Sequence, residues 1–305
     1  MPSLRQLEYL VALSETRHFR RAADRVGVSQ PTLSAQLAEL ERRLGLQLVE
    51  RSRSGVLITP AGEKILALAI DVTRQVRSIR EIARSHQGGL SGLVRLGLPF
   101  TIGPYLLPLI VAPLHRAYPG LRLYVREDMP TALPDGLESG LHDLLILPIP
   151  IRNGDFESIP LFREELHLVG PADHPLAAQG TVHKSALRGE PILALAPGHQ
   201  LRTQVTALCE EFGASLQTSF EGTSLDTLRH MAGMGLGLTF LPDLYVRRTL
   251  QADTAIRRIE LKGRPLYRTI GLVWRQSSAL APAFQRLGDD IRNSLRTELP
   301  DLMVL

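Results

Sequence analysis

The fold is decided by residues 18–59, which read HFRRAADRVGVSQPTLSAQLAELERRLGLQLVERSRSGVLIT. Apolar residues in the first part follow the i, i+3, i+4, i+7 spacing of an amphipathic helix: Phe19, Ala22, Ala23 and Val26. Gly27 then permits a tight stop. Ser29 can cap a second helix through its hydroxyl, and Pro31 is tolerated in the first turn, where no intrahelical hydrogen bond is lost. The pattern predicts two helices joined by a tight turn.

The second helix has an apolar side made of Leu33, Leu37, Leu40 and Leu44, and Gly45 ends it. Residues 46–49 and 56–58 then read as two strands of a hairpin tipped with Arg53. This order is typical of a winged helix-turn-helix, whose second helix enters the major groove of DNA. The alternative is a small helical subdomain with a solvated basic face. The predicted DNA-binding residues are Arg20, Ser29, Gln30, Pro31, Thr32, Ser34, Gln36 and Arg53.

Three motifs of this stretch resemble the DNA-binding signature of LysR-type transcriptional regulators: Ala22-Ala23, Ser29-Gln30-Pro31-Thr32-Leu33-Ser34 and Leu40-Glu41-Arg42-Arg43-Leu44-Gly45. The resemblance implies a winged helix-turn-helix, a dimerising linker helix, a two-lobed effector domain and, commonly, a tetramer built as a dimer of dimers. It also implies double-stranded promoter DNA and a small-molecule effector as partners.

Composition is consistent with a DNA reader joined to a separate sensor. Of the 305 residues, positions 1–87 carry 14 Lys and Arg against 9 Asp and Glu, so the net charge of +4 lies in the N-terminal part. No signal peptide and no apolar run of transmembrane length is evident, which predicts a cytoplasmic protein without membrane contact. The single cysteine, Cys209, excludes an intramolecular disulfide. The nine histidines have no metal-binding spacing, so we predict no metal and no cofactor.

The predicted domains are a winged helix-turn-helix at 1–59, a linker helix with a hinge at 60–92, and an effector domain at 93–305. In the linker, a coiled-coil seam is predicted from Ile65, Ala69, Val72, Val76, Ile79 and Ala83. Packing of this helix on the chain's own core is the alternative. The glycines and serines of residues 85–92 predict the hinge.

The effector domain is predicted as α/β, with lobe I at 93–164 and 270–305 and lobe II at 165–269. Strands at 93–98, 121–127 and 143–149 alternate with helices at 105–118 and 133–140, which predicts a largely parallel sheet. In lobe II, strands are expected at 192–196, 217–220 and 236–241. Helices are expected there at 201–212 and 224–234. A return strand at 268–274 and a closing helix at about 282–295 complete a fold that resembles periplasmic binding proteins.

Helix starts are the best candidates for an effector site, because they present free N–H groups and a positive dipole. The predicted effector residues are Thr101, Ile102, Pro148, His199, Gln200, Arg202, Thr223 and Ser224. Ordinary helix capping explains Thr101, Thr223 and Ser224 equally well. The glycine-rich residues 233–237 follow a helix and precede a strand, the reverse of the dinucleotide-binding order, and no catalytic spacing occurs. The sequence therefore predicts no enzyme.

Within the LysR-type family, the chain most resembles the OxyR hydrogen-peroxide sensors, through motifs such as Ile102-Gly103-Pro104-Tyr105-Leu106-Leu107-Pro108 and Arg268-Thr269-Ile270-Gly271-Leu272-Val273. In those sensors a Gly-His-Cys-Leu-Arg motif carries the cysteine that peroxide oxidises. This chain has Gly198-His199-Gln200-Leu201-Arg202, so Gln200 replaces the reactive cysteine and Cys209 stands where its partner lies. A threonine of those sensors that helps to hold peroxide falls at Pro130.

The chain is thus interpreted either as a natural relative that senses something other than peroxide, or as a peroxide sensor in which Gln200 is an engineered replacement of the cysteine. Pro130 favours the first interpretation. Glutamine cannot be oxidised as a thiol is, but it can hydrogen-bond to a small organic ligand. Cys209 falls beside an apolar helical stripe and is expected to be a buried core thiol. A redox switch through Cys209 between subunits is the alternative trigger. A solute-binding protein is disfavoured by the first 90 residues.

Overall fold

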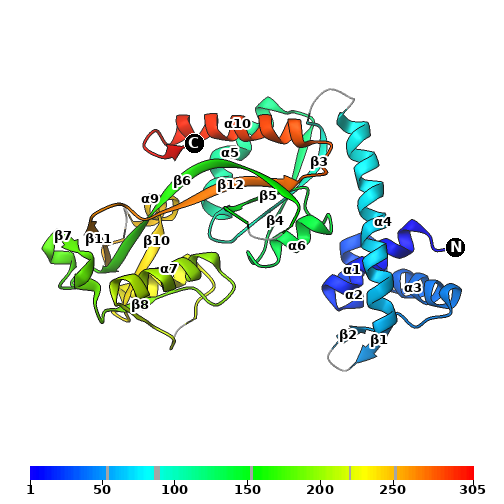
Figure 1. The fold of residues 1–305 in the computed structure, drawn as a ribbon, viewed down its shortest axis with the longest axis horizontal. Helices are drawn as coiled ribbons and strands as arrows, with labels where there is room; N and C mark the ends of the chain where they lie inside the picture. Colours follow the sequence, from blue (N-terminus) through cyan, green and yellow to red (C-terminus); the bar gives the residue numbers. More distant parts are fainter. Residues whose placement is uncertain (53–54, 86–89, 152–153, 220, 251–252) are drawn as a thin grey trace. The chain divides into compact units, whose positions relative to one another are not determined.

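The protein is described by a computed structural model covering residues 1–52, 55–85, 90–151, 154–219, 221–250 and 253–305. The chain divides into two compact units, Met1–His86 and Gln87–Leu305 (Figure 1). Arg53 and residues 86–89 of the predicted hinge lie outside the described residues.

The N-terminal unit contains the helices and the hairpin that the sequence predicts. Its elements are α1 (Leu4–Thr16), α2 (Phe19–Val26), α3 (Gln30–Leu44), β1 (Val49–Ser52), β2 (Gly55–Ile58) and α4 (Pro60–Ser85). Gly27 and Gly45 take left-handed φ angles of 72° and 65°, which lets the chain leave α2 and α3 sharply. Leu33, Leu37 and Leu40 are buried in one core shared with α1 and α2. The unit is a winged helix-turn-helix.

The first strand of the hairpin starts later than predicted. The sequence placed it at residues 46–49, but β1 covers Val49–Ser52. The physical reason is Glu41 of α3, whose Oε1 accepts hydrogen bonds from the backbone N–H of Leu48 at 2.8 Å and of Val49 at 3.1 Å. The Leu48 donor therefore binds a helix side chain just before the ladder begins, and the Val49 donor does so at the first residue of β1.

Helix α4 uses its apolar residues in two ways. Leu66 and Ala69 belong to the core of the N-terminal unit, where α4 packs against α1. Leu68, Val72 and Ile79 are exposed by 62%, 41% and 66%. The predicted seam therefore needs a correction, because buried Ala69 is not on the exposed stripe and Leu68 takes that position. Of the other seam residues, Ile65 and Val76 are half-buried, and the side chain of Ala83 lies outside the described set.

The C-terminal unit is built on eleven strands of the described chain, which form one curled sheet. The strands are β3 (Gly92–Leu98), β4 (Leu121–Glu127), β5 (Leu144–Pro148), β6 (Phe156–Pro171), β7 (Thr181–His183), β8 (Pro191–Leu193), β9 (Ser215–Leu216), β10 (Leu238–Pro242), β11 (Ile256–Lys262), β12 (Tyr267–Arg275) and β13 (Met303–Val304). The helices are α5 (Gly103–Ala117), α6 (Leu133–Glu138), α7 (Gln200–Phe212), α8 (Leu225–Gly233), α9 (Asp243–Thr249) and α10 (Ala281–Glu298), with 3₁₀ turns η1 (Ala177–Gln179) and η2 (Lys184–Leu187).

Two hydrophobic clusters divide this unit into two lobes joined by long strands. The main path through the sheet is β4-β3-β5-β12-β6-β10-β8-β9. Strand β6 supplies Leu161 and Phe162 to one cluster and Leu168 and Val169 to the other. Figure 1 shows β6 and β12 running side by side. The chain is therefore an α/β protein with an N-terminal winged helix-turn-helix and a two-lobed domain like the periplasmic binding proteins.

The sheet is less parallel than the sequence predicted. Helix-connected strands such as β3 and β4 are parallel, but β12 and β6 are antiparallel to each other, and β5 and β10 pair with them antiparallel. The strand expected at 217–220 is absent from the described residues there, and β9 is Ser215–Leu216 instead. The N-terminal half of β6, together with β11 and α9, was not predicted. These elements carry charged residues within or beside apolar runs. The charged residues interrupt the helical or strand-like spacing of the apolar residues, so the sequence pattern did not indicate these elements.

Candidate functional site

Most of the predicted DNA-binding residues lie at the cap and in the first half of α3. The Ser29 hydroxyl accepts a hydrogen bond from the Thr32 backbone N–H at 3.3 Å and lies 2.7 Å from the Thr32 hydroxyl. Both hydroxyls thus serve the helix cap, as expected for a serine in this position. Gln30 and Pro31 are exposed next to them. The first turn of α3 therefore offers the Gln30 amide as its least committed polar group.

Two further predicted residues of α3 are held by neighbours. The side-chain oxygen of Gln36 accepts a hydrogen bond from Nε2 of Gln6 on α1 at 3.2 Å, which fixes the exposed Gln36 amide against the preceding helices. Ser34 is half-buried and also has a partner. Arg20 lies on α2, exposed, and no described residue pairs with its side chain. A free arginine beside a recognition helix suits contact with DNA phosphates.

The two arginines of α3, Arg42 and Arg43, share one carboxylate, that of Glu39. Glu39 accepts hydrogen bonds from Arg42 and Arg43 at 2.7 and 2.6 Å. These bonds lower the pKa of the Glu39 carboxyl to about 2. Glu39 therefore offsets one of these two positive charges, whereas the side chain of the exposed Arg20 on α2 pairs with no described residue.

In the C-terminal unit, Thr101 is part of a buried charged network. Arg268 on β12 donates from Nε to Glu164 Oε1 on β6 at 2.7 Å, and from its terminal nitrogens to the Thr101 hydroxyl and carbonyl at 3.4 and 3.2 Å. Glu164 Oε2 accepts the backbone N–H of Leu244 at 3.2 Å. One ion pair thus holds together the two crossing strands, the loop before α5 and the start of α9. Ile102, also predicted, is fully buried in the adjoining core.

His199 is the most unusual polar residue near the start of α7. Its side chain is 1% exposed, and neither ring nitrogen has a hydrogen-bond partner among the described residues. Burial lowers the pKa of its imidazole, so the ring is neutral at pH 7. A neutral imidazole carries one donor and one acceptor, and buried polar atoms are normally paired. His199 precedes Gln200, the first residue of α7, which is half-buried.

The loop before α7 touches the loop that follows β4. A Cβ atom added to Gly198, whose φ is 93°, would lie 3.0 Å from Met129 Cε and 3.7 Å from the Thr131 hydroxyl oxygen. This left-handed backbone conformation favours glycine, and a larger residue would also crowd Met129. Thr131 was missed by the sequence analysis, which considered Pro130 alone. The structure places a threonine hydroxyl beside the loop of His199 all the same, supplied one residue later.

The remaining predicted effector residues are held in different ways. Arg202 donates to the Leu195 carbonyl at 2.8 Å and lies 3.5 Å from the Glu221 carboxylate, so it ties two loops together. Ser224 caps α8 by accepting the Thr227 N–H at 3.1 Å, as the capping interpretation predicted. Thr223 is exposed, and Pro148 is buried at the end of β5.

These placements gather part of the predicted set. The Ala196 N–H donates to the Gly222 carbonyl at 2.8 Å, which brings the segment before His199 beside the segment before Thr223. Thr101 is instead engaged by Arg268. The functional residues that sequence reasoning missed are Glu164, Arg268 and Thr131. Charged residues inside otherwise apolar strands were the available signal for the first two.

Cys209 lies on the buried side of α7, as predicted. Burial, followed by the nearby Glu210 charge, raises the pKa of its thiol to about 11. Thiols react as thiolates, so this environment suppresses reactivity. Residues 200 and 209 belong to the same helix, and nine residues of α-helix span about 13 Å. That separation far exceeds the reach of a disulfide unless the helix unfolds.

Neither a metal centre nor a membrane span emerges from the part of the chain that the structure describes. There, histidine, cysteine, aspartate and glutamate side chains do not form a group of three or more suited to a metal ion. Helices long and apolar enough to cross a membrane are also missing from the described ranges.

A winged helix-turn-helix followed by a long helix and a two-lobed α/β domain defines a DNA-binding regulator with its own sensor. The family model of the bacterial regulatory helix-turn-helix protein, lysR family, matches residues 4–63, and that of the LysR substrate binding domain matches residues 87–296. The chain belongs to the LysR family of transcriptional regulators, and it is of the OxyR type.

Its relatives agree along nearly the whole chain. The hydrogen peroxide-inducible genes activator of Dickeya chrysanthemi is 42% identical over 300 residues, which is 98% of both chains. The DNA-binding transcriptional dual regulator OxyR of Escherichia coli K12 is 43% identical over 290 residues, 95% of each. A full-length OxyR variant from Pseudomonas aeruginosa has a TM-score of 0.75 at 37% identity, covering 96% of this chain and 95% of that one. The predicted family is confirmed.

Proposed function

We propose that this regulator responds to a small uncharged molecule that binds where the loop of His199 meets the loop of Met129 and Thr131. The observation that carries the proposal is the buried, neutral imidazole of His199, whose two nitrogens have no hydrogen-bond partner within the described ranges of the chain. Such a ring pairs fully with a ligand that both donates and accepts a hydrogen bond. The Gln200 amide offers the same pair of functions at the start of α7.

Chemistry of this kind requires no thiol. The relatives are named for hydrogen peroxide, which is itself small, uncharged and able to donate and accept. Peroxide is therefore the first compound to test, as a ligand rather than as an oxidant. A switch through Cys209 is the weaker candidate, because that thiol is 3% exposed and its pKa is about 11.

The response reaches DNA through the N-terminal unit. Gln30, Thr32 and Gln36 read base edges in the major groove, and Arg20 contacts phosphates. A promoter site with two half-sites binds two winged helix-turn-helix units, one from each subunit, so the working protein is at least a dimer. The exposed Leu68, Val72 and Ile79 of α4 support a helix-to-helix contact between subunits. Two such dimers form the working tetramer.

In this proposal the protein is a cytoplasmic regulator, neither an enzyme nor a cofactor carrier. The domains retain the predicted bounds, with the reading head at 1–59, the linker at 60–92 and the effector domain at 93–305. Ligand binding changes how the two lobes close, since β6 and β12 connect them, and the change re-spaces the reading heads.

The test compares His199→Phe with Thr203→Ala, an exposed position on the same helix. Thermal unfolding of each purified full-length protein is measured with hydrogen peroxide and with acetamide, two uncharged probes. We expect at least one probe to raise the Tm of the wild type and of Thr203→Ala but not of His199→Phe. The proposal is wrong if neither probe shifts the wild type and His199→Phe also regulates a promoter reporter normally in cells.

A further inference from the structure

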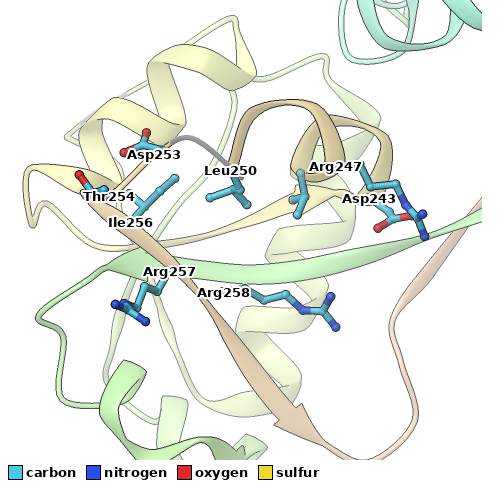
Figure 2. A pocket seen from close by; sticks show the side chains of 9 residues that line it. Asp243, Arg247, Leu250, Asp253, Thr254, Ile256, Arg257 and Arg258 are labelled. Atoms are coloured by element: carbon cyan, nitrogen blue, oxygen red, sulfur yellow. The ribbon is translucent and has the colours of Figure 1, made fainter.

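A separate pocket lies in lobe II, between α9 and β11. Its volume is about 560 Å³, within the range of small-molecule sites. Residues 243–250 form one wall, and residues 253–258 form the other. Figure 2 shows Asp243 and Arg247 beside each other on α9, and Arg257 and Arg258 leaving β11 in different directions. None of the predicted effector residues lines this pocket.

The carboxylates of the pocket are already neutralised. Asp243 accepts a hydrogen bond from Arg247 Nε at 2.6 Å and lies 2.8 Å from Nε2 of buried His167. Burial opposes ionisation of Asp243, but these two hydrogen bonds outweigh it and lower the pKa of the carboxyl. Asp253 forms an ion pair with Arg229 of α8, which does not line the pocket. Neither aspartate therefore repels an incoming anion with a free charge.

The two arginines of β11 that line the pocket, Arg257 and Arg258, differ in whether a carboxylate pairs with them. Arg258 is engaged by Glu260, with Nε 2.7 Å from its carboxylate. Arg257 is exposed, and its side chain forms no ion pair or hydrogen bond with another described residue. A guanidinium without a partner at the mouth of a pocket is suited to a carboxylate, which it can bind with two parallel hydrogen bonds.

Apart from Thr254, the rest of the lining is apolar. Val246 on α9 and Leu250, which directly follows α9, line the pocket together with Ile256 on β11. A hydrated inorganic ion gains nothing from such a surface, whereas the hydrocarbon part of an organic ligand is stabilised when it is buried against it. The lining thus combines an apolar wall with a single uncompensated cation.

We propose that this pocket binds a small monoanionic organic carboxylate, with its apolar body against Val246, Leu250 and Ile256 and its carboxylate on Arg257. Asp243 and Arg247 line the same pocket, and the Asp243 carboxylate also pairs with His167, so the pocket lies next to a charged group of β6, the strand that joins the lobes. The pocket is therefore a second effector site, independent of the loop of His199.

Calorimetric titration of the full-length protein with benzoate tests this site, with benzamide as the uncharged analogue. Arg257→Gln removes the free guanidinium, and Arg264→Gln is the matched control, an exposed arginine outside the pocket. We expect saturable benzoate binding to the wild type and to Arg264→Gln, and binding weakened about ten- to hundred-fold in Arg257→Gln. Benzamide is expected to bind far more weakly than benzoate.

Four results would overturn the proposal: no saturable benzoate binding, equal binding by Arg257→Gln, equal binding of benzamide, or stronger binding of inorganic phosphate than of benzoate. His199→Phe separates the two sites, because it must leave benzoate binding unchanged. Loss of benzoate binding in that variant assigns the carboxylate to the His199 loop and contradicts the second site.

Discussion

Glu164 and Arg268 form an ion pair withdrawn from solvent where β6 and β12 run side by side: Arg268 Nε lies 2.7 Å from Glu164 Oε1, and the two side chains are 0% and 1% exposed. Arg268 also donates a hydrogen bond to the Thr101 hydroxyl, and Glu164 accepts one from the Leu244 backbone N–H. A buried pair of this kind fixes one arrangement of its surroundings, because loss of either partner leaves an uncompensated charge.

Arg268→Ala is therefore expected to destabilise the C-terminal unit by about 3–5 kcal/mol. Urea unfolding followed by the fluorescence of Trp274, the single tryptophan, reports on this unit. Arg264→Ala removes an exposed arginine and should change the unfolding free energy by less than about 0.5 kcal/mol. A loss below about 1 kcal/mol for Arg268→Ala would show that the pair is not what holds the strands together.

His199 makes a pH-dependent contribution to stability. Burial lowers the pKa of the folded imidazole below its ordinary 6.5, so the unfolded chain takes up a proton first as pH falls. The contribution of the neutral ring is present above about pH 6.5 and is lost as pH falls toward the folded pKa. His199→Asn lacks this titration. The wild-type advantage over the variant in unfolding free energy should shrink from pH 7.5 to 5.5, and a constant difference would contradict the burial argument.

Base reading by α3 can be separated from phosphate contact by α2. Gln30→Ala should weaken binding to the specific promoter by about 1–3 kcal/mol while leaving non-specific binding nearly unchanged. Arg20→Ala should weaken both and reduce the salt dependence of binding by about one counterion. Gln179→Ala, an exposed glutamine of the C-terminal unit, is the control. An equal loss on specific and random DNA for Gln30→Ala would remove it from the base-reading set.

The exposed apolar stripe of α4 should hold subunits together. Val72→Asp places a charge on the stripe and is expected to shift the protein to smaller oligomers in sedimentation experiments, since burying an unpaired charge in a coiled-coil seam is unfavourable. Ala67→Asp puts the same charge on an exposed part of the helix away from Leu68 and Ile79. Equal sedimentation of both variants with the wild type would exclude the stripe as the contact.

Local sequence rules predicted the N-terminal unit well. The Ser29 cap, the Gly27 and Gly45 stops and the buried leucines of α3 depend on residues within one or two turns. The same rules failed where a distant residue intervenes. Glu41 delays β1 by capturing two N–H groups seven and eight residues away. Burial of Ala69 by α1 could not be read from the heptad spacing of α4 alone.

The candidate site shows the same division. Helix starts at Gln200 and Leu225 follow from local pattern, and the resemblance to OxyR sensors identified Gln200 as the decisive departure. Glu164 and Arg268 are 104 residues apart, so nothing in the spacing paired them. Thr131 was passed over because alignment by motif pointed to Pro130, and only folding of the loop against Gly198 brought its hydroxyl into place.

The central claim is that this regulator controls DNA without thiol chemistry. It is tested most directly by a footprint on the DNA upstream of the protein's own gene, with peroxide at concentrations that oxidise thiols and without it, for the wild type and Cys209→Ser. Because the only thiol is buried, we expect Cys209→Ser to give the same footprint as the wild type in each condition. A peroxide-dependent change in footprint length that occurs in the wild type and disappears in Cys209→Ser would contradict the account.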